Sequence, residues 1–224
     1  NTPTARFWRF LKRAVRTSLW FGVIVLTGFA LLNGPAYWQR ASFATNGTPI
    51  NRSVIETPTS APTINYDPEI VIPKIGVRAP VIYDVAFNSI IDNLHNGVVR
   101  YEGTANPGQV GNVVIVGHSS DFPWSTGRYK TIFSLLDKLT SGDEIILPYG
   151  TDRYVYKITE TKVVKPTDLS VLARTPTATI TLITCYPVGT TLNRLIVRAN
   201  LVAGPVGPPQ TTEPFLGQSL TAAR

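Results

Sequence analysis

Residues 179–187 have the sequence Thr-Ile-Thr-Leu-Ile-Thr-Cys-Tyr-Pro, and they contain the only cysteine of the 224-residue chain. The β-branched run up to Thr184 predicts a strand, which Pro187 ends because proline has no N–H to donate to a sheet. Cys185 therefore stands at a strand end, beside a loop. A thiol in such a place can meet a substrate, whereas a thiol within a strand usually packs as a small hydrophobe. Taken alone, the segment leaves both interpretations open.

Similar short apolar runs, rich in Val, Ile, Thr and Tyr, recur on both sides of this segment between about Asp67 and Val202. Clusters of Gly, Pro and Asp separate them, a pattern typical of an all-β barrel or sandwich. Two stretches have helical spacing, the short Ser89–Leu94 and the longer Tyr129–Leu139. The predicted strands are Glu69–Ile72, Val77–Tyr83, Asn112–Gly117, Glu144–Pro148, Tyr154–Val164, Thr179–Thr184 and Leu195–Leu201.

The N-terminal region combines basic residues with a long apolar run. Residues 17–38 carry no charge, and 22 residues at about 1.5 Å rise can cross about 30 Å of hydrocarbon. Five basic residues precede the run, so the positive-inside rule predicts that residues 1–16 are cytoplasmic and that the remainder is outside the cell. A cleaved signal peptide is the alternative, but the run exceeds a signal's 7–15 apolar residues. We expect a single transmembrane helix that contacts the lipid bilayer.

Segments of low complexity flank the predicted domain. Residues 39–66 are rich in Thr, Ser and Pro and lack periodicity, so we interpret them as a stalk. Residues 204–224 are rich in Pro and Gly, and we expect a disordered tail. The predicted β-domain thus occupies residues 67–203.

The composition excludes two broad classes of function. The net charge is +7, but seven of the 21 basic residues precede the first acidic residue, Glu56, which leaves 14 basic and 14 acidic residues after it. A nucleic-acid-binding domain carries its own basic face, so we expect no nucleic-acid partner. The only histidines are His95 and His118, which with one cysteine do not match the usual zinc spacings. We expect no metal and no cofactor, and we interpret His95 as structural.

His118 and Arg194 stand in positions like that of Cys185. His118 follows the predicted strand Asn112–Gly117, and Arg194 begins the last predicted strand, where Arg198 shares its face. A nucleophilic thiol needs a base, and its tetrahedral intermediate needs a cationic or hydrogen-bonding partner. At ordinary pKa values of about 8.5 and 6.5, only a few per cent of the thiol is ionised at neutral pH.

These segments resemble the sortase family. Thr181-Leu-Ile-Thr-Cys185, followed nine residues later by Arg194, resembles the T-L-x-T-C…R signature of the family. The short loop between Cys185 and Arg194 is similar to that of class C and of some class D or E members, which leaves the subclass unresolved. Further similar segments, in the family's order, are Asn112–His118, Ile72–Gly76 with Val77–Val81, and Ile132–Ile145.

The resemblance implies an eight-stranded β-barrel with one or two short helices. Cys185 would be the nucleophile that forms an acyl-thioester, His118 the general acid/base, and Arg194, rather than Arg198, the stabiliser of the oxyanion. Thr184 would lie beside the substrate groove. The implied reaction cleaves an LPxTG-like sorting signal of an exported protein and transfers that protein to an amine, either a cell-wall peptide or a pilin lysine.

The order and spacing of His118 and Cys185 argue against other thiol enzymes and leave one alternative, a non-catalytic domain. Papain-like proteases place Cys before His, and L,D-transpeptidases hold both in one short stretch, whereas here His118 precedes Cys185 by 67 residues. A non-catalytic, membrane-anchored β-domain that binds a surface partner would place the two side chains far apart.

Overall fold

The computed structural model describes residues 3–47 and 68–211. The chain has two compact units, Asn1–Gly34 and Pro35–Arg224. The predicted stalk falls mostly outside the described residues, as do residues 212–224 of the predicted tail.

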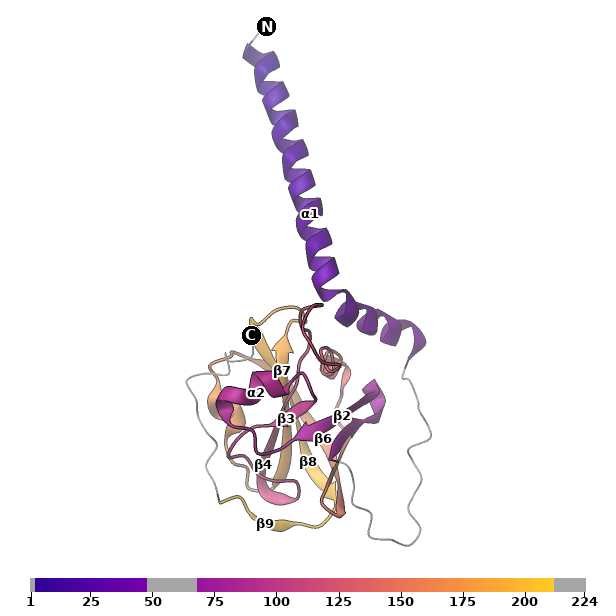
Figure 1. The fold of residues 1–224 in the computed structure, drawn as a ribbon, viewed down its shortest axis with the longest axis vertical. Coiled ribbons are helices and arrows are strands. Elements are labelled where there is room, and N and C mark those ends of the chain that lie inside the picture. The colour runs from indigo at the N-terminus through magenta and orange to yellow at the C-terminus, as the bar shows by residue number, and fades with distance from the viewer. Residues whose placement is uncertain (1–2, 48–67, 212–224) are drawn as a thin grey trace. The chain divides into compact units, whose positions relative to one another are not determined.

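A single long helix, α1 (Pro3–Asn46), contains the N-terminal apolar run and is drawn in indigo in Figure 1. Its stretch Phe10–Thr45 is long and apolar enough to cross a membrane, and an 18-residue window of it has a mean hydropathy of 1.7. An apolar N-terminal helix of this kind suggests a membrane anchor, and a signal sequence meets the same criterion. Residues 17–38, predicted to span the bilayer, lie within it, and the helix continues into the predicted stalk.

Eight strands form a closed barrel, which confirms the predicted fold class (Figure 1). Their order around the barrel is β3-β2-β1-β5-β6-β8-β7-β4, and pairing of β3 with β4 closes the ring. The strands are β1 (Glu69–Ile72), β2 (Val77–Ile82), β3 (Val98–Arg100), β4 (Gln109–Val116), β5 (Glu144–Tyr149), β6 (Asp152–Val164), β7 (Ala178–Tyr186) and β8 (Asn193–Ala203).

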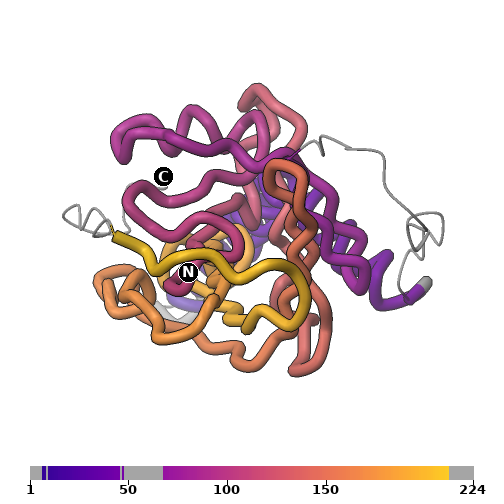
Figure 2. The backbone as a smooth tube through the Cα atoms, turned by 90° about the horizontal axis from the view of Figure 1, so that it is seen from below, coloured from indigo at the N-terminus to yellow at the C-terminus, as the bar shows by residue number. Residues whose placement is uncertain are grey.

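Two of the observed strands were absent from the sequence prediction. β3 has only three residues, all buried, and so shows neither the length nor the alternation that identifies a strand. β9 (Gly207–Pro209) pairs in parallel with β4 and crosses the lower end of the barrel, which Figure 2 views from below. It lies in the segment that the sequence predicts to be a tail.

Alternating side chains of the strands fill the barrel. β1 and β2 bury every second residue, as a sheet with one face in the core requires. Tyr156 and Phe133 are among the largest buried side chains of this interior. A second apolar cluster, which includes Leu94, Tyr101 and Ile183, lies where α2 (Ile90–Asn93) and the preceding 3₁₀ turn η3 (Phe87–Ser89) pack. This second cluster leads to the site described below.

The helix predicted over Tyr129–Leu139 is wrong. The structure has consecutive turns there, closed by i→i+3 hydrogen bonds, and only one short 3₁₀ helix, η4 (Leu136–Lys138). Residues 133–136 are four consecutive buried residues, whereas an amphipathic helix would turn at least one of them towards solvent. The Phe133 N–H also donates to the His118 carbonyl, which ties the segment to the end of β4. Tertiary burial has overridden the local spacing.

The last turns of α1 belong to the same unit as the barrel and pack against it. Arg40 forms a bidentate ion pair with Asp137, at 2.8 and 2.5 Å, and donates to the Ser134 carbonyl at 2.6 Å. Tyr37 donates to the Val188 carbonyl at 3.3 Å, and Phe43 packs against the core. Residues 35–46 are therefore part of the folded domain and not only of the apolar helix.

Candidate functional site

Strand register places the three predicted catalytic residues at one end of the barrel. β4 and β7 are parallel, with Val116 opposite Ile183, so His118 and Cys185, two residues further on in each strand, follow at the same level. β7 and β8 are antiparallel, and Cys185 pairs directly with Arg194. Two residues that are 67 positions apart in sequence thus emerge side by side.

All three side chains line one pocket. Six apolar or aromatic residues line it as well, so the polar groups stand in a mainly apolar enclosure. These residues are Phe87, Ile90, Leu94, Tyr101, Val116 and Ile183. The thiol, imidazole and guanidinium therefore lie close together. A non-catalytic β-domain was expected to hold the Cys and His side chains far apart.

Thr184 also lines the pocket, but its hydroxyl is engaged. Its Oγ1 donates to the Gly117 carbonyl at 2.8 Å, and the residue is 3% exposed. This bond joins β7 to β4 beyond their last ladder pair, immediately before Cys185 and His118. Its evident contribution is to hold the two strand ends together.

The two arginines of β8 differ in their surroundings. Arg194 is 2% exposed, and its Nη1 donates to the carbonyls of Thr191 and Asn193 at 3.1 and 3.0 Å. These bonds fold the side chain against the loop that precedes it, where it reaches the pocket. Arg198 instead lies near Glu160, with 3.7 Å between Nη1 and Oε2. Arg194, and not Arg198, is at the pocket.

Burial shifts the pKa values of the thiol and the imidazole in opposite directions. Burial raises the pKa of Cys185, and the nearby Arg194 charge opposes that rise. Burial lowers the pKa of His118, as does His95, while Asp121 acts in the opposite direction. Both main shifts favour the uncharged forms, so a neutral thiol beside a neutral imidazole dominates at neutral pH.

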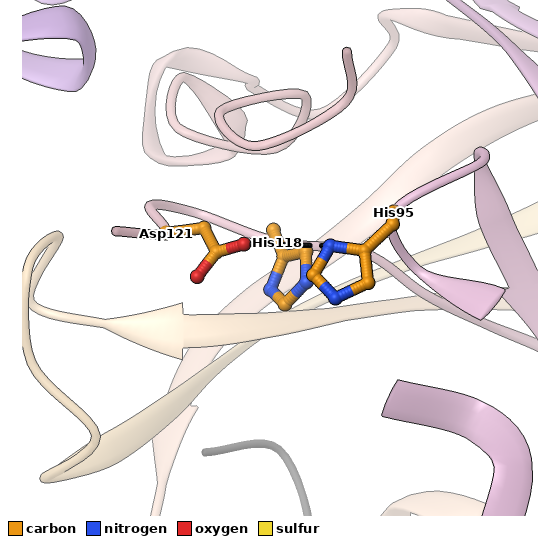
Figure 3. Close-up of side chains that lie close together, drawn as sticks. All are labelled: His95, His118 and Asp121. Carbon is orange, nitrogen blue, oxygen red and sulfur yellow. Dashed lines mark ion pairs between the residues drawn. The ribbon is translucent and has the colours of Figure 1, made fainter. Parts of the chain in front are cut away.

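His95 and Asp121 stand beside His118, as Figure 3 shows. The His95 and His118 rings lie 6.0 Å apart between centroids, and His95 Nδ1 is 3.6 Å from Asp121 Oδ2. Sequence reasoning interpreted His95 as structural and did not select Asp121. The available signal was the position of Asp121 three residues after the strand-end histidine, but nothing in the sequence indicated that His95 would come close.

One end of the closed barrel thus brings together a thiol, an imidazole and a guanidinium, the kinds of group that cysteine-based acyl transfer uses. Residues 70–202 match the family model described as "Sortase domain". The match covers more than half of the chain, which therefore belongs to the sortase family.

Individual relatives agree with this assignment. Sortase D of Bacillus subtilis (strain 168) is 28% identical over 130 residues, and sortase A of Listeria monocytogenes is 30% identical over 138 residues. These matches cover 56% and 61% of this chain and 59% of each relative, so the chain spans less than two thirds of either.

Solved structures of sortases have the same barrel. Listeria monocytogenes sortase A has a TM-score of 0.52 at 27% identity, covering 62% of this chain and 88% of that one. A Clostridium perfringens sortase D5 transpeptidase has a TM-score of 0.51 at 34% identity, covering 63% and 83%. Streptomyces coelicolor sortase E1, solved with a tripeptide in the active site, has a TM-score of 0.52 at 25% identity, covering 66% and 93%. These neighbours span several subclasses and leave the subclass of this chain open.

Proposed function

We propose that this protein is a membrane-anchored cysteine transpeptidase that cleaves an LPxTG-like sorting signal and transfers the exported protein to an amine. The observation that carries the proposal is the convergence of Cys185, His118 and Arg194 in one pocket, at the ends of three adjacent strands. Family membership supports the same reaction class.

In the first half-reaction, the Cys185 thiolate attacks the scissile carbonyl carbon. The carbonyl oxygen becomes an oxyanion, which the Arg194 guanidinium stabilises. Collapse breaks the carbon–nitrogen bond, His118 gives its proton to the leaving amine, and the acyl group remains on sulfur as a thioester.

In the second half-reaction, an acceptor amine replaces the leaving peptide. His118, now neutral, removes a proton from the amine as it attacks the thioester, and the new amide forms as the Cys185 thiolate leaves. The thioester retains part of the free energy of the original peptide bond, so ligation needs no ATP. A cell-wall peptide or a pilin lysine would supply the amine.

The protonation states of Cys185 and His118 determine how much of the reactive form is present. The reactive pair is thiolate with imidazolium, yet burial raises the thiol pKa and lowers the imidazole pKa. The active ionisation state is therefore a minority form, and catalysis must proceed through that fraction.

The lining of the pocket supports a peptide substrate with an apolar side chain. Phe87, Leu94 and Ile183 present apolar surface next to Cys185, where a leucine-like side chain would be buried. Among the relatives, the Streptomyces coelicolor enzyme was solved with a tripeptide in its active site, and a Clostridium perfringens sortase C with a C-terminal cell wall sorting motif. Thr184 would reach the substrate only after giving up its bond to Gly117.

The proposed location is the cell membrane, with residues 1–16 in the cytoplasm and the barrel outside. The apolar helix α1 supports an anchor, and the basic residues before its apolar run support this orientation.

The direct test is mass spectrometry of the full chain in detergent micelles, incubated with a library of LPxTG-like peptides and with glycine or lysine amines. We expect an acyl-enzyme adduct on Cys185 and a transpeptidation product. Cys185→Ala should lower turnover by at least about 10³-fold, because the remaining groups cannot form the thioester.

Arg198→Met is the matched control, since Arg198 lies on the same strand but does not line the pocket. It should retain the adduct. Turnover by a folded Cys185→Ala protein would place the nucleophile elsewhere. No adduct on the unmodified chain with any peptide would favour the alternative function, a non-catalytic β-domain that binds a surface partner.

A further inference from the structure

His95, His118 and Asp121 form a cluster that the transpeptidation chemistry does not require as a group. His95 lies in the turn after α2, His118 follows β4, and Asp121 lies in the loop after His118. One potential ligand atom from each side chain lies within 4.8 Å of the other two (Figure 3). Three potential metal ligands, carried by two loops, thus lie close together beside the pocket.

One polar atom on each of these side chains is buried and unsatisfied. Within the described residues, His95 Nδ1, His118 Nε2 and Asp121 Oδ2 have no hydrogen-bond partner. The nearest approach among them, 3.6 Å between His95 Nδ1 and Asp121 Oδ2, is too long for a hydrogen bond. Buried polar groups in proteins are normally paired, so three unpaired atoms at one place indicate a ligand.

The surrounding residues hold this cluster in place. The other oxygen of Asp121, Oδ1, accepts from the Phe122 N–H at 2.7 Å and from Ser125 Oγ at 3.0 Å, which orients Oδ2 towards His95. Gly127 has φ +94°, and a Cβ there would lie 2.2 Å from the His95 carbonyl oxygen. The loop that carries Asp121 therefore packs directly on the His95 backbone.

We propose that His95, His118 and Asp121 bind a divalent first-row transition metal, with Zn²⁺ as the best match. Two imidazoles and one carboxylate suit Zn²⁺, whereas Mg²⁺ and Ca²⁺ prefer oxygen ligands alone. Metal–ligand bonds of about 2.0–2.1 Å place tetrahedral ligand atoms roughly 3.4 Å apart. The ligand atoms here lie within 4.8 Å of one another, so the two loops must move closer together on binding. Three protein ligands leave a fourth position for water.

Metal binding at this cluster has a consequence that rests on the proposed function. An imidazole whose nitrogen is bound to metal is held neutral and fixed, so His118 can no longer give a proton to the leaving amine. The site then acts as a reversible inhibitory switch on the general acid/base. It does not involve the thiol.

The binding test uses Co²⁺ as a visible probe, titrated into the metal-free full chain in detergent micelles. The unmodified chain should bind one Co²⁺ with a d–d absorption band and no sulfur-to-cobalt charge-transfer band. His95→Gln and Asp121→Asn should each weaken binding at least about tenfold, whereas Cys185→Ala and the exposed control Asp92→Asn should bind as the unmodified chain does. Equal affinity in all variants, or loss of affinity in Cys185→Ala, would overturn the site.

The functional test measures peptide cleavage against free Zn²⁺, with each protein compared with its own metal-free rate and with folding verified by thermal melting. We expect Zn²⁺ to inhibit the unmodified chain, a chelator to reverse the inhibition, and His95→Gln to need at least about tenfold more Zn²⁺. Equal inhibition of both proteins would overturn the switch. Co²⁺ binding without any metal-free peptide cleavage would instead overturn the proposed function and leave the metal site standing.

Discussion

Two groups of side chains meet at the pocket, and different parts of the fold position them. Cys185 and Arg194 face each other as partners in the hydrogen-bonded ladder between β7 and β8. His95 and Asp121 reach His118 from a turn and a loop, with no ladder between them. The first arrangement persists as long as the strands pair, whereas the second depends on local loop packing.

The difference shows in how well the polar groups are satisfied. Arg194 is buried, yet it donates to two carbonyls of its own loop. The cluster of His95, His118 and Asp121 contains three buried atoms without partners in the described structure, and each such group costs about 1–3 kcal/mol. We therefore expect substitutions in the ladder to act mainly on the chemistry at Cys185, and substitutions in the loops to act mainly on the position of His95 and Asp121 beside His118.

Among these substitutions, we expect Arg194→Met to have the largest effect on the rate of peptide cleavage. Methionine preserves much of the apolar packing but removes the charge that stabilises the oxyanion, so kcat/KM for peptide cleavage should fall by about 10²–10³-fold. The midpoint of thermal unfolding should fall modestly, because the carbonyls of Thr191 and Asn193 lose their donor while the β7–β8 ladder remains. Arg198→Met serves as the control, and a similar rate loss in that control would remove the distinction between the two arginines.

Gly127→Ala tests how far the packing of the loop on His95 holds the cluster of His95, His118 and Asp121 in place. The new Cβ would meet the His95 carbonyl oxygen in a backbone conformation that disfavours side chains, so we expect a loss of roughly 1–3 kcal/mol in the free energy of unfolding and weaker Co²⁺ binding. Urea titration and Co²⁺ titration measure the two effects.

Gly142→Ala is the matched control for this change. Gly142 has φ +91°, close to that of Gly127, but a Cβ there meets nothing within 4 Å. It reports the backbone strain alone, and the difference between the variants reports the close approach to His95. Equal destabilisation of the two variants would show that this approach contributes nothing.

The smallest expected effect is a shift in the pH at which the Cys185 thiol ionises. Because burial raises the pKa of Cys185, the rate of alkylation by iodoacetamide should rise at higher pH in the folded chain than in the same chain unfolded in urea. Arg194→Met should move the profile to still higher pH, since the Arg194 charge lowers this pKa. The other titratable groups facing the pocket are His118 and Tyr101, and the raised pKa of Tyr101, about 12, keeps it neutral here. A folded-state profile at lower pH than the unfolded one would contradict the assignment.

The sequence predicted the positions of residues that lie at the ends of regular strands. The β-branched and apolar runs beside Cys185, His118 and Arg194 placed each residue at the end of a predicted strand, and strand ends at one edge of a barrel meet. Prediction failed where contacts are made by irregular segments. The spacing within Tyr129–Leu139 predicted a helix, but burial of residues 133–136 on all sides produced turns.

The approach of His95 to His118 could not be predicted for the same reason. It depends on where a four-residue helix ends and on a loop that closes over it at Gly127. Neither contact follows from a periodic pattern, because local spacing carries no information about which loops pack together.

The order of strands in the ring also has a consequence for biosynthesis. β1 to β6 can pair among themselves, which leaves a gap between β4 and β6 that only the β7–β8 hairpin fills. That hairpin carries Cys185 and Arg194, and its contacts with β4 span a long stretch of chain, so we expect it to join late. A nascent chain would thus hold His118 long before it holds a thiol beside it. Completing the barrel and bringing Cys185, His118 and Arg194 together are then one event.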